Sequence, residues 1–420
     1  MTAPKHLHKT DLRAAARLAT DATAGLVDLV EAVHERIARL PGLAEPATPG
    51  RTGGITGLVY KTVRGVTHVV GGTTDALLAW LQPVVGPSPG QPAARLATPE
   101  REAVVAALNG VLGDHLAVTH TPLATPLALR TGGLALPLEA AGLAARLPEA
   151  TSHVAVLIHG LCMNDLQWQR AGHDHGAMLA REHGWTPVYL HYNSGLHIST
   201  NGQQLADLLA QLVAHWPLPI ERLAFVGHSM GGLVARSAVH SARQAGHPWA
   251  APGGPLADMV FLGTPHHGAP LERAGHGVDL LLSATPYSAP FTRLGQLRSA
   301  GITDLRHGNL LDSDWNGPTS ASGFGAGSDN RTPVPLPVDL RCYAVAASLG
   351  GDTGDLKHRL KQSLVGDGLV PLDSALGRHK NPAQQLAFAP ERQWVAHGIG
   401  HLDLLGSLEV GTRVKAWMRR

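Results

Sequence analysis

The chain has 420 residues, a formal net charge of +2 and a hydrophobic content of 44%. That much apolar material is ample for a large core, and the length exceeds that of one average domain. The near-neutral charge and the lack of a long Lys/Arg run argue against a nucleic-acid partner. The sequence contains no stretch of about 18 consecutive apolar residues, and the first residues, MTAPKHLHKT, lack the apolar centre of a signal peptide. We therefore expect a soluble cytoplasmic protein.

The cysteines and histidines do not form the patterns typical of disulfide frameworks or metal sites. Cys162 and Cys342 adjoin the ends of predicted strands and are expected to be buried free thiols. The 25 histidines are scattered, with neither an H-E-x-x-H motif nor a Cys/His cluster. From these residues we predict no metal and no cofactor.

The first 118 residues show helical patterns and no convincing strand. Apolar residues recur at helical spacing over Asp11–Leu40 and Ile55–Leu81. Thr98-Pro99-Glu100 then supplies a cap, a first-turn proline and an early acid for a third helix. We therefore predict an N-terminal helical extension over residues 1–118, which either packs against the rest of the protein or contacts a lipid surface or polymer granule peripherally.

From about residue 120 the pattern changes to a hairpin followed by alternating strands and helices. Leu127–Leu136 is typical of a β-hairpin around Gly132-Gly133. Apolar runs predict strands at Val154–Ile158, Pro187–His191, Leu223–Val226, Met259–Leu262, Cys342–Ala346 and Gln393–Ala396. Helical spacing predicts helices at Asp165–Glu182, Thr200–Trp216, Met230–Ala245 and Leu402–Trp417. This order predicts an α/β domain over residues 119–420, with a mainly parallel sheet flanked by helices.

The segment Leu223–Leu233, LAFVGHSMGGL, is the most informative in the chain. An apolar run typical of a buried strand is followed by a G-x-S-x-G motif and then by a helical pattern. A sharp strand-to-helix turn that exposes a hydroxyl needs glycine on both sides, because side chains would clash there. The helix N-terminus then brings amide N–H groups and a favourable dipole close to Ser229. The pattern predicts Ser229 as a nucleophile.

A serine hydroxyl is a weak nucleophile at neutral pH, so it needs a base, which in turn needs an orienting acid. On this type of sheet both should follow later strands. Asp367 lies between two glycines on a turn after the predicted strand at Cys342–Ala346. We predict Asp367 as the acid, with Asp352, Asp355 and Asp373 as weaker competitors.

His401 lies on the loop just ahead of the last predicted helix, and we predict it as the base, with His397 as its rival. Two amide N–H groups should bind the negative charge that develops on the substrate oxygen. One should come from Met230, the residue after the nucleophile. The other should come from Leu161, on the loop after the strand Val154–Ile158.

The residues around these groups are predicted to form the substrate-binding surface. His159 and Gly160 belong to the loop that carries Leu161, and His228 lies inside the elbow. Packing is the alternative role for His228, because it precedes the predicted acid in the chain and points away from the position of a base.

Several of these segments occur together in one order. They are the loop His159-Gly160-Leu161, the Ser229 elbow, Gly263-Thr264-Pro265-His266-His267-Gly268, the turn Gly366–Pro371 and His401-Leu402-Asp403. In this combination residues 120–420 resemble the α/β-hydrolase superfamily, and more closely bacterial triacylglycerol lipases and GPI inositol-deacylase-like hydrolases. The resemblance implies an α/β-hydrolase fold with a Ser229–His401–Asp367 triad and an oxyanion hole at Leu161 and Met230.

The same resemblance carries three further expectations. The segment Gly263–Gly268 would line the acyl site ahead of a lid, formed by an insertion at about residues 269–337. Such a lid would favour apolar acyl chains over small polar substrates. In some of these lipases an aspartate near the catalytic histidine binds a structural calcium, which makes Asp403 a calcium candidate.

We therefore expect a serine hydrolase that cleaves carboxylic esters of lipid-like substrates through an acyl-enzyme. An acyltransferase on the same fold is an alternative, because both activities share the acyl-enzyme step. A non-catalytic lipid- or granule-binding scaffold is a second alternative, although no triad residue is missing.

Overall fold

The computed structural model describes residues 99–269, 299–316, 329–350 and 366–419. The predicted helices Asp11–Leu40 and Ile55–Leu81 lie outside these ranges, as does most of the expected lid. The third predicted helix is confirmed as α3 (Pro99–Val118). It belongs to the same compact unit as the chain from Ala124 onward. The division at residue 118 stays a prediction.

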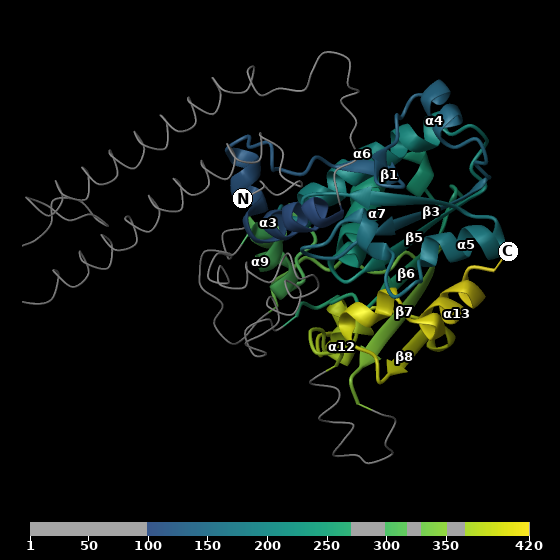
Figure 1. The fold of residues 1–420 in the computed structure, drawn as a ribbon. Coiled ribbons are helices and arrows are strands. Elements are labelled where there is room, and N and C mark those ends of the chain that lie inside the picture. The colour runs from purple at the N-terminus through teal and green to yellow at the C-terminus, as the bar shows by residue number, and fades with distance from the viewer. Residues whose placement is uncertain (1–98, 270–298, 317–328, 351–365, 420) are drawn as a thin grey trace, which may run out of the picture. The chain divides into compact units, whose positions relative to one another are not determined.

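An eight-stranded sheet forms the centre of this unit (Figure 1). Its strand order is β2-β1-β4-β3-β5-β6-β7-β8. The hairpin strands β1 and β2 are antiparallel to each other, β1 is antiparallel to β4, and the remaining neighbours are parallel. The hairpin and the six predicted strands are confirmed. The bounds are β1 Ala128–Thr131, β2 Leu134–Ala135, β3 His153–Ile158, β4 Thr186–His191, β5 Arg222–His228, β6 Leu256–Leu262, β7 Arg341–Ser348 and β8 Gln393–His397.

Helices cover the sheet because its central strands are apolar on both faces. All seven residues of β5 are buried, which is typical of a parallel strand between two helical layers. Helix α6 packs on α7, and α5 packs on α13; Figure 1 shows these two pairs on either side of the strands. The helical bounds are α4 Ala140–Arg146, η1 Asp165–Trp168, α5 His175–His183, α6 Ile198–His215, α7 Met230–Gln244, η2 Pro248–Ala250, α9 Ala300–His307, α10 Asp312–Trp315, α12 Leu372–Ala375, η4 Pro382–Gln384, η5 Pro390–Arg392, η6 His401–Leu405 and α13 Leu408–Trp417.

Two of the predicted helices are each divided in the structure. The predicted helix Asp165–Glu182 is η1 followed by α5, because Ala171 has a positive φ of 50° and the side chain of Asp174 caps a new helix at Ala177 N. The predicted helix Leu402–Trp417 is η6 followed by α13, which begins where Ser407 Oγ accepts a hydrogen bond from Val410 N. In both cases local capping outweighs the continuous apolar spacing.

The connections around β3 reverse direction across the sheet. From β3 the chain crosses to β4 on one side and then returns to β5 on the other side of β3. At such a reversal the loops after the two central strands diverge and leave room for a ligand beyond their carboxyl ends. The loop His159–Leu161 and the elbow at Ser229 lie at these ends of β3 and β5.

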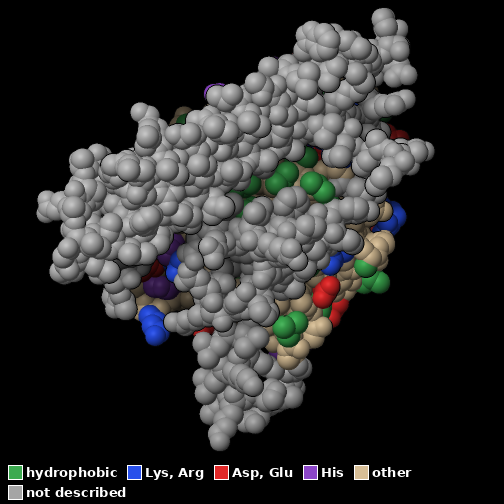
Figure 2. All heavy atoms as spheres, turned by 60° about the vertical axis from the view of Figure 1, so that its left-hand side comes forward, with side chains coloured by type: hydrophobic (Ala, Val, Ile, Leu, Met, Phe, Trp, Pro, Cys, Tyr) green, Lys and Arg blue, Asp and Glu red, His purple; other side chains and the backbone are tan. Residues whose placement is uncertain are grey.

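The described surface is chemically mixed. The described side chains visible in Figure 2 include hydrophobic, basic and acidic groups next to one another. Among the residues that the structure describes, no helix is long and apolar enough to cross a bilayer.

The opposite, amino-terminal end of the sheet contains a buried ion cluster that joins three strands. Asp258 on β6 is fully buried, and its carboxylate lies 2.8 Å from Arg222 Nε on β5 and 2.9 Å from Arg341 Nε on β7. Arg222 is itself nearly buried. Its charge therefore depends on Asp258 for compensation.

Replacing Asp258 with Asn should lower the free energy of unfolding by about 3 kcal/mol, because a buried guanidinium loses its counter-charge. Asp373→Asn is the matched control: Asp373 pairs with Arg378 at 3.6 Å with both side chains more than half exposed, so its loss should cost under about 1 kcal/mol. Urea denaturation of the two variants measures the difference. Equal destabilisation would contradict this account of the cluster.

Candidate active site

Ser229 occupies the turn between β5 and α7 in a backbone conformation that is rare for any residue other than glycine. Its φ is 53° and its ψ is −124°. A positive φ brings Cβ close to the backbone and costs free energy, so surrounding contacts must hold it. One such contact is the hydrogen bond from Ser229 N to Leu262 O, at 2.9 Å. This is the backbone geometry predicted for a serine on a strand-to-helix turn, and the residue itself is buried, with an exposed fraction of 2%.

The two glycines of the G-x-S-x-G motif are required because other backbone segments approach them closely. A Cβ at Gly227 would lie 2.7 Å from the Cα of Gly232, and a Cβ at Gly231 would overlap the carbonyl oxygen of Ile158 at the end of β3. The first turn of α7 can therefore lie directly over the neighbouring strand only because these positions have no side chain.

Asp367 and His401 form a buried pair. The Nδ1–H of His401 donates to Asp367 Oδ2 at 2.7 Å, and the exposed fractions of both residues are 1%. The other carboxylate oxygen, Oδ1, accepts from the backbone N–H of Leu369 and of Val370. Gly366, with φ 54°, makes the turn that leads into this arrangement. Both carboxylate oxygens of Asp367 are thereby fixed, and Oδ2 orients the imidazole ring.

The ring of His401 lies against the residues next to Ser229. His228 Nε2 donates to His401 O at 3.1 Å, and a Cβ at Gly263 would lie 3.2 Å from His401 Nδ1. With Nδ1 engaged by Asp367, Nε2 is the ring nitrogen left for a second partner. This Nε2 is buried, and no group in the described part of the chain hydrogen-bonds to it, Ser229 Oγ included. Such contacts often tighten only when substrate binds.

The two predicted oxyanion donors have backbone N–H groups without protein acceptors in the described residues. Both Leu161 and Met230 are fully buried. The loop of Leu161 approaches Ser229 closely, since a Cβ at Gly160 would lie 3.1 Å from Ser229 Cβ. Next to Leu161, Cys162 has a φ of 60°, and its N–H donates to Ser194 Oγ at 3.1 Å, which helps to fix the loop.

The two histidines assigned to the substrate-binding surface are buried and neutral. Burial lowers the pKa of His159 to about 3, and its ring stacks on Tyr192 with centroids 4.3 Å apart. Burial, followed by the nearby His401, also holds the pKa of His228 well below its usual value. Both residues are completely inaccessible to solvent. They therefore support the backbone of the loops around Ser229 and His401.

His175 is a supporting residue that the sequence reading missed. Its Nε2–H donates to Leu404 O at 2.9 Å, and its Nδ1 accepts from His173 Nε2 at 2.9 Å. Leu404 belongs to η6, the turn that begins with His401. His175 and His228 thus hold two carbonyl groups of the same turn. No local sequence pattern indicates this role, because the contact joins α5 to a segment more than half the chain away.

Helix α3 also supports the loop that carries Leu161. A Cβ at Gly110 would lie 2.9 Å from the Cα of Cys162, so α3 packs directly on the loop that carries Leu161. Asn193, on the loop that follows β4 and contains Ser194, donates from Nδ2 to Gly113 O at 2.8 Å. This hydrogen bond joins that loop to the same helix.

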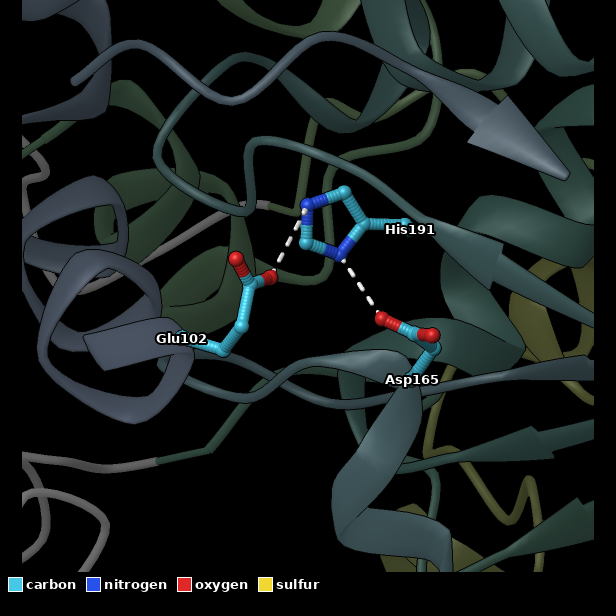
Figure 3. Close-up of side chains that lie close together, drawn as sticks. All are labelled: Glu102, Asp165 and His191. Atoms are coloured by element: carbon cyan, nitrogen blue, oxygen red, sulfur yellow. Dashed lines mark ion pairs between the residues drawn. The ribbon is translucent and has the colours of Figure 1, made fainter. Parts of the chain in front are cut away.

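A charged cluster joins α3 to the sheet near this loop (Figure 3). His191 Nδ1 lies 2.9 Å from Asp165 Oδ1, and its Nε2 lies 3.8 Å from Glu102 Oε2. These three residues are close enough together to hold a metal ion. However, Arg130 NH1 already lies 3.0 Å from Glu102 Oε2 and 3.2 Å from Asp165 Oδ1, where it would repel a cation. Despite burial, contact with His191 and Arg130 holds the pKa of Asp165 below its ordinary value. The donor set therefore fits an ion-pair network better than a metal.

The competing site residues lie apart from this arrangement or outside the described residues. His397, at the end of β8, is exposed, and Asp373 pairs with Arg378. Asp352 and Asp355 lie outside the described residues. Asp403 is exposed, and its Oδ2 accepts from Gly400 N. The calcium role of Asp403 stays a prediction.

The parallel sheet, the elbow and the order of the loops define an α/β-hydrolase fold. Residues 148–281 match the model of a family described as "Putative serine esterase (DUF676)". This segment includes the loop of Leu161 and the Ser229 elbow, whereas Asp367 and His401 follow it. The resemblance to the α/β-hydrolase superfamily is thereby confirmed, and the family supports an ester hydrolase.

Solved structures similar to this chain have low sequence identity to it, and no curated protein matches it. They include the mature lipase BlEst2 of Bacillus licheniformis, with 17% identity, 63% of this chain and 91% of that chain covered, and a TM-score of 0.40. The product of the Listeria innocua gene lin2722 has 15% identity, 64% and 94% coverage, and a TM-score of 0.34. The Pyrococcus furiosus esterase PF2001 has 13% identity, 64% and 82% coverage, and a TM-score of 0.35.

The buried His175 should make stability depend on pH. Burial lowers its pKa to about 4, from an ordinary value of 6.5. The unfolded chain therefore binds a proton between pH 6.5 and pH 4 that the folded chain does not, and stability falls as the pH decreases through this window, by roughly 3 kcal/mol for this group. Thermal unfolding of the wild type and of His175→Gln, measured across the window, should give a shallower decline for the variant. Parallel curves would contradict the assignment.

Proposed function

We propose that this protein is a serine esterase that cleaves carboxylic esters with apolar acyl groups through an acyl-enzyme. Ser229 is the nucleophile, His401 the base and Asp367 the orienting acid. The observation that carries the proposal is the strained backbone of Ser229 next to a buried Asp367–His401 pair. The Nε2 atom of His401 has no hydrogen-bond partner in the described residues. Strain of this kind is concentrated at functional sites.

In the first half of the reaction, Ser229 Oγ attacks the ester carbonyl carbon and its proton passes to His401 Nε2. Asp367 keeps the other ring nitrogen protonated and stabilises the imidazolium that forms. The carbonyl oxygen becomes negatively charged and accepts hydrogen bonds from the N–H groups of Leu161 and Met230. The carbon–oxygen bond to the alcohol then breaks, and the alcohol leaves with the proton from Nε2.

In the second half, a water molecule attacks the acyl-enzyme and gives one proton to His401 Nε2. The bond to Ser229 Oγ breaks, the proton returns to the serine and the carboxylic acid is released. If an alcohol replaces water in this step, the product is a new ester, which is the acyltransferase alternative.

The preference for apolar acyl groups is supported by the surroundings of the site. Leu161 and Met230 are fully buried, and His159 and His228 are neutral because burial disfavours their charged forms. A site of this kind offers little to a charged or strongly hydrated acyl chain. The description of the matched family as serine esterases agrees with the reaction type.

Ser229→Ala and His401→Ala should each lower kcat/KM for p-nitrophenyl butyrate by at least about a thousandfold, because each removes a group that acts in the transition state. His397→Ala is the matched control, since this exposed histidine lies four residues before the proposed base. It should retain activity within about threefold. A large loss in His397→Ala together with an active His401→Ala would reverse the assignment of the base.

A series of p-nitrophenyl esters from acetate to palmitate should show its highest kcat/KM at medium or long acyl chains, since each additional buried CH₂ contributes up to about 0.8 kcal/mol of transition-state binding. Ser229→Ala supplies the background at each length. A maximum at acetate would contradict the apolar acyl site. Added alcohol that diverts most of the acyl group into a new ester would identify an acyltransferase instead.

A further inference from the structure

A cavity lies along the second half of α7, which begins next to Ser229. Its volume is about 500 Å³, which is within the usual range for small-molecule sites. One face of α7, Met259 of β6 and the extended segment before β7 form its walls. The lining residues are Arg236, Val239, His240, Arg243, Gln244, Met259 and 334–338.

Arg236 is the unusual residue of this cavity. Its exposed fraction is 6%, yet no carboxylate pairs with it in the described part of the chain. Its guanidinium donates to Val334 O at 2.5 Å and to His266 Nδ1 at 3.4 Å, whereas the buried Nε has no partner. Burial lowers its pKa to about 9, so the group is still a cation at neutral pH. Buried charges are normally paired, because burial without compensation is costly.

The other charged groups around the cavity do not neutralise Arg236. Arg243 is engaged with Asp339, with Arg243 NH2 2.6 Å from Asp339 Oδ2. Partial burial lowers the pKa of His240, although Asp314 opposes this effect, so the ring is neutral at neutral pH. Arg331, which lies near enough to repel Arg236, pairs with Asp329. The cavity therefore has a net charge close to one positive unit.

The remaining walls are mostly apolar. Val239 and Met259 are buried in the core beneath the cavity, and Val334, Leu336 and Pro337 line it from the opposite side. A single buried cation among apolar walls complements a single negative charge on an apolar body. Inorganic phosphate matches less well, because a strongly hydrated dianion requires several donors.

The geometry points to a second binding site on this protein, for a small organic carboxylate with an apolar chain. The carboxylate pairs with Arg236, and the chain lies against Val239, Met259 and Leu336. This site is independent of Ser229 and of the proposed ester hydrolysis. Nothing in its argument requires the protein to be an esterase.

The test is calorimetric titration of the purified full-length protein with octanoate. Wild type should bind octanoate at least tenfold more tightly than octan-1-ol or inorganic phosphate. Arg236→Gln should weaken octanoate binding by at least tenfold, and Val239→Phe, which fills the cavity while keeping the cation, should abolish it. Arg378→Gln removes an exposed guanidinium outside the cavity and should leave the affinity unchanged.

Two outcomes would overturn the inference. The first is octanoate binding that neither Arg236→Gln nor Val239→Phe weakens, because octanoate would then bind elsewhere, for example as a reaction product next to Ser229. The second is inorganic phosphate binding as tightly as octanoate, which would show that the apolar walls contribute nothing to the affinity. If Arg236→Gln does not fold, Val239→Phe alone decides, because unchanged octanoate binding in that variant excludes the cavity. These results do not depend on whether Ser229→Ala loses esterase activity.

Discussion

The turn from β5 into α7 packs so closely against neighbouring backbone that no side chain fits at its glycines. The arrangement of the candidate site depends on this close packing. The first turn of α7 lies on the carbonyl oxygen of Ile158, where a side chain at Gly231 would not fit. This close packing places the loop of Leu161 against Ser229, where a Cβ at Gly160 would lie 3.1 Å from Ser229 Cβ. It also sets the hydrogen bond from Ser229 N to Leu262 O, so that the following Gly263 meets the ring of His401.

The sequence predicts those parts of this arrangement that are determined by residues adjacent in the chain. The strand at Leu223–Val226 is a continuous apolar run, and the elbow glycines are required by the turn itself. Asp367 stands out because its glycine neighbours permit a tight turn after a strand. The sheet was predictable for a similar reason, since its strands are short apolar runs separated by helical patterns. The divided helices were not predictable from spacing alone, because the caps at Asp174 and Ser407 act within an otherwise unbroken periodicity.

The supporting contacts could not be predicted, because they join residues that are distant in the chain. His175 reaches Leu404, and Cys162 N–H reaches Ser194 Oγ, through hydrogen bonds that no local pattern encodes. The packing of Gly110 on Cys162 likewise depends on where α3 lies. A glycine in a helix is ordinarily unfavourable by up to about 1 kcal/mol relative to alanine, so only the contact explains its presence. The burial of Arg236 without a carboxylate partner could not be predicted either, because an arginine in a helix normally lies at the surface.

The positive φ of Ser229 has an evolutionary consequence. A glycine at this position would relieve roughly 1–3 kcal/mol of backbone strain, and its extra freedom in the unfolded chain would cost only about 0.4–1 kcal/mol. Drift towards glycine would therefore stabilise the fold while deleting the hydroxyl. A lineage with no use for that hydroxyl would be expected to lose it, so under the proposed function the serine marks a position where natural selection favours chemistry over stability.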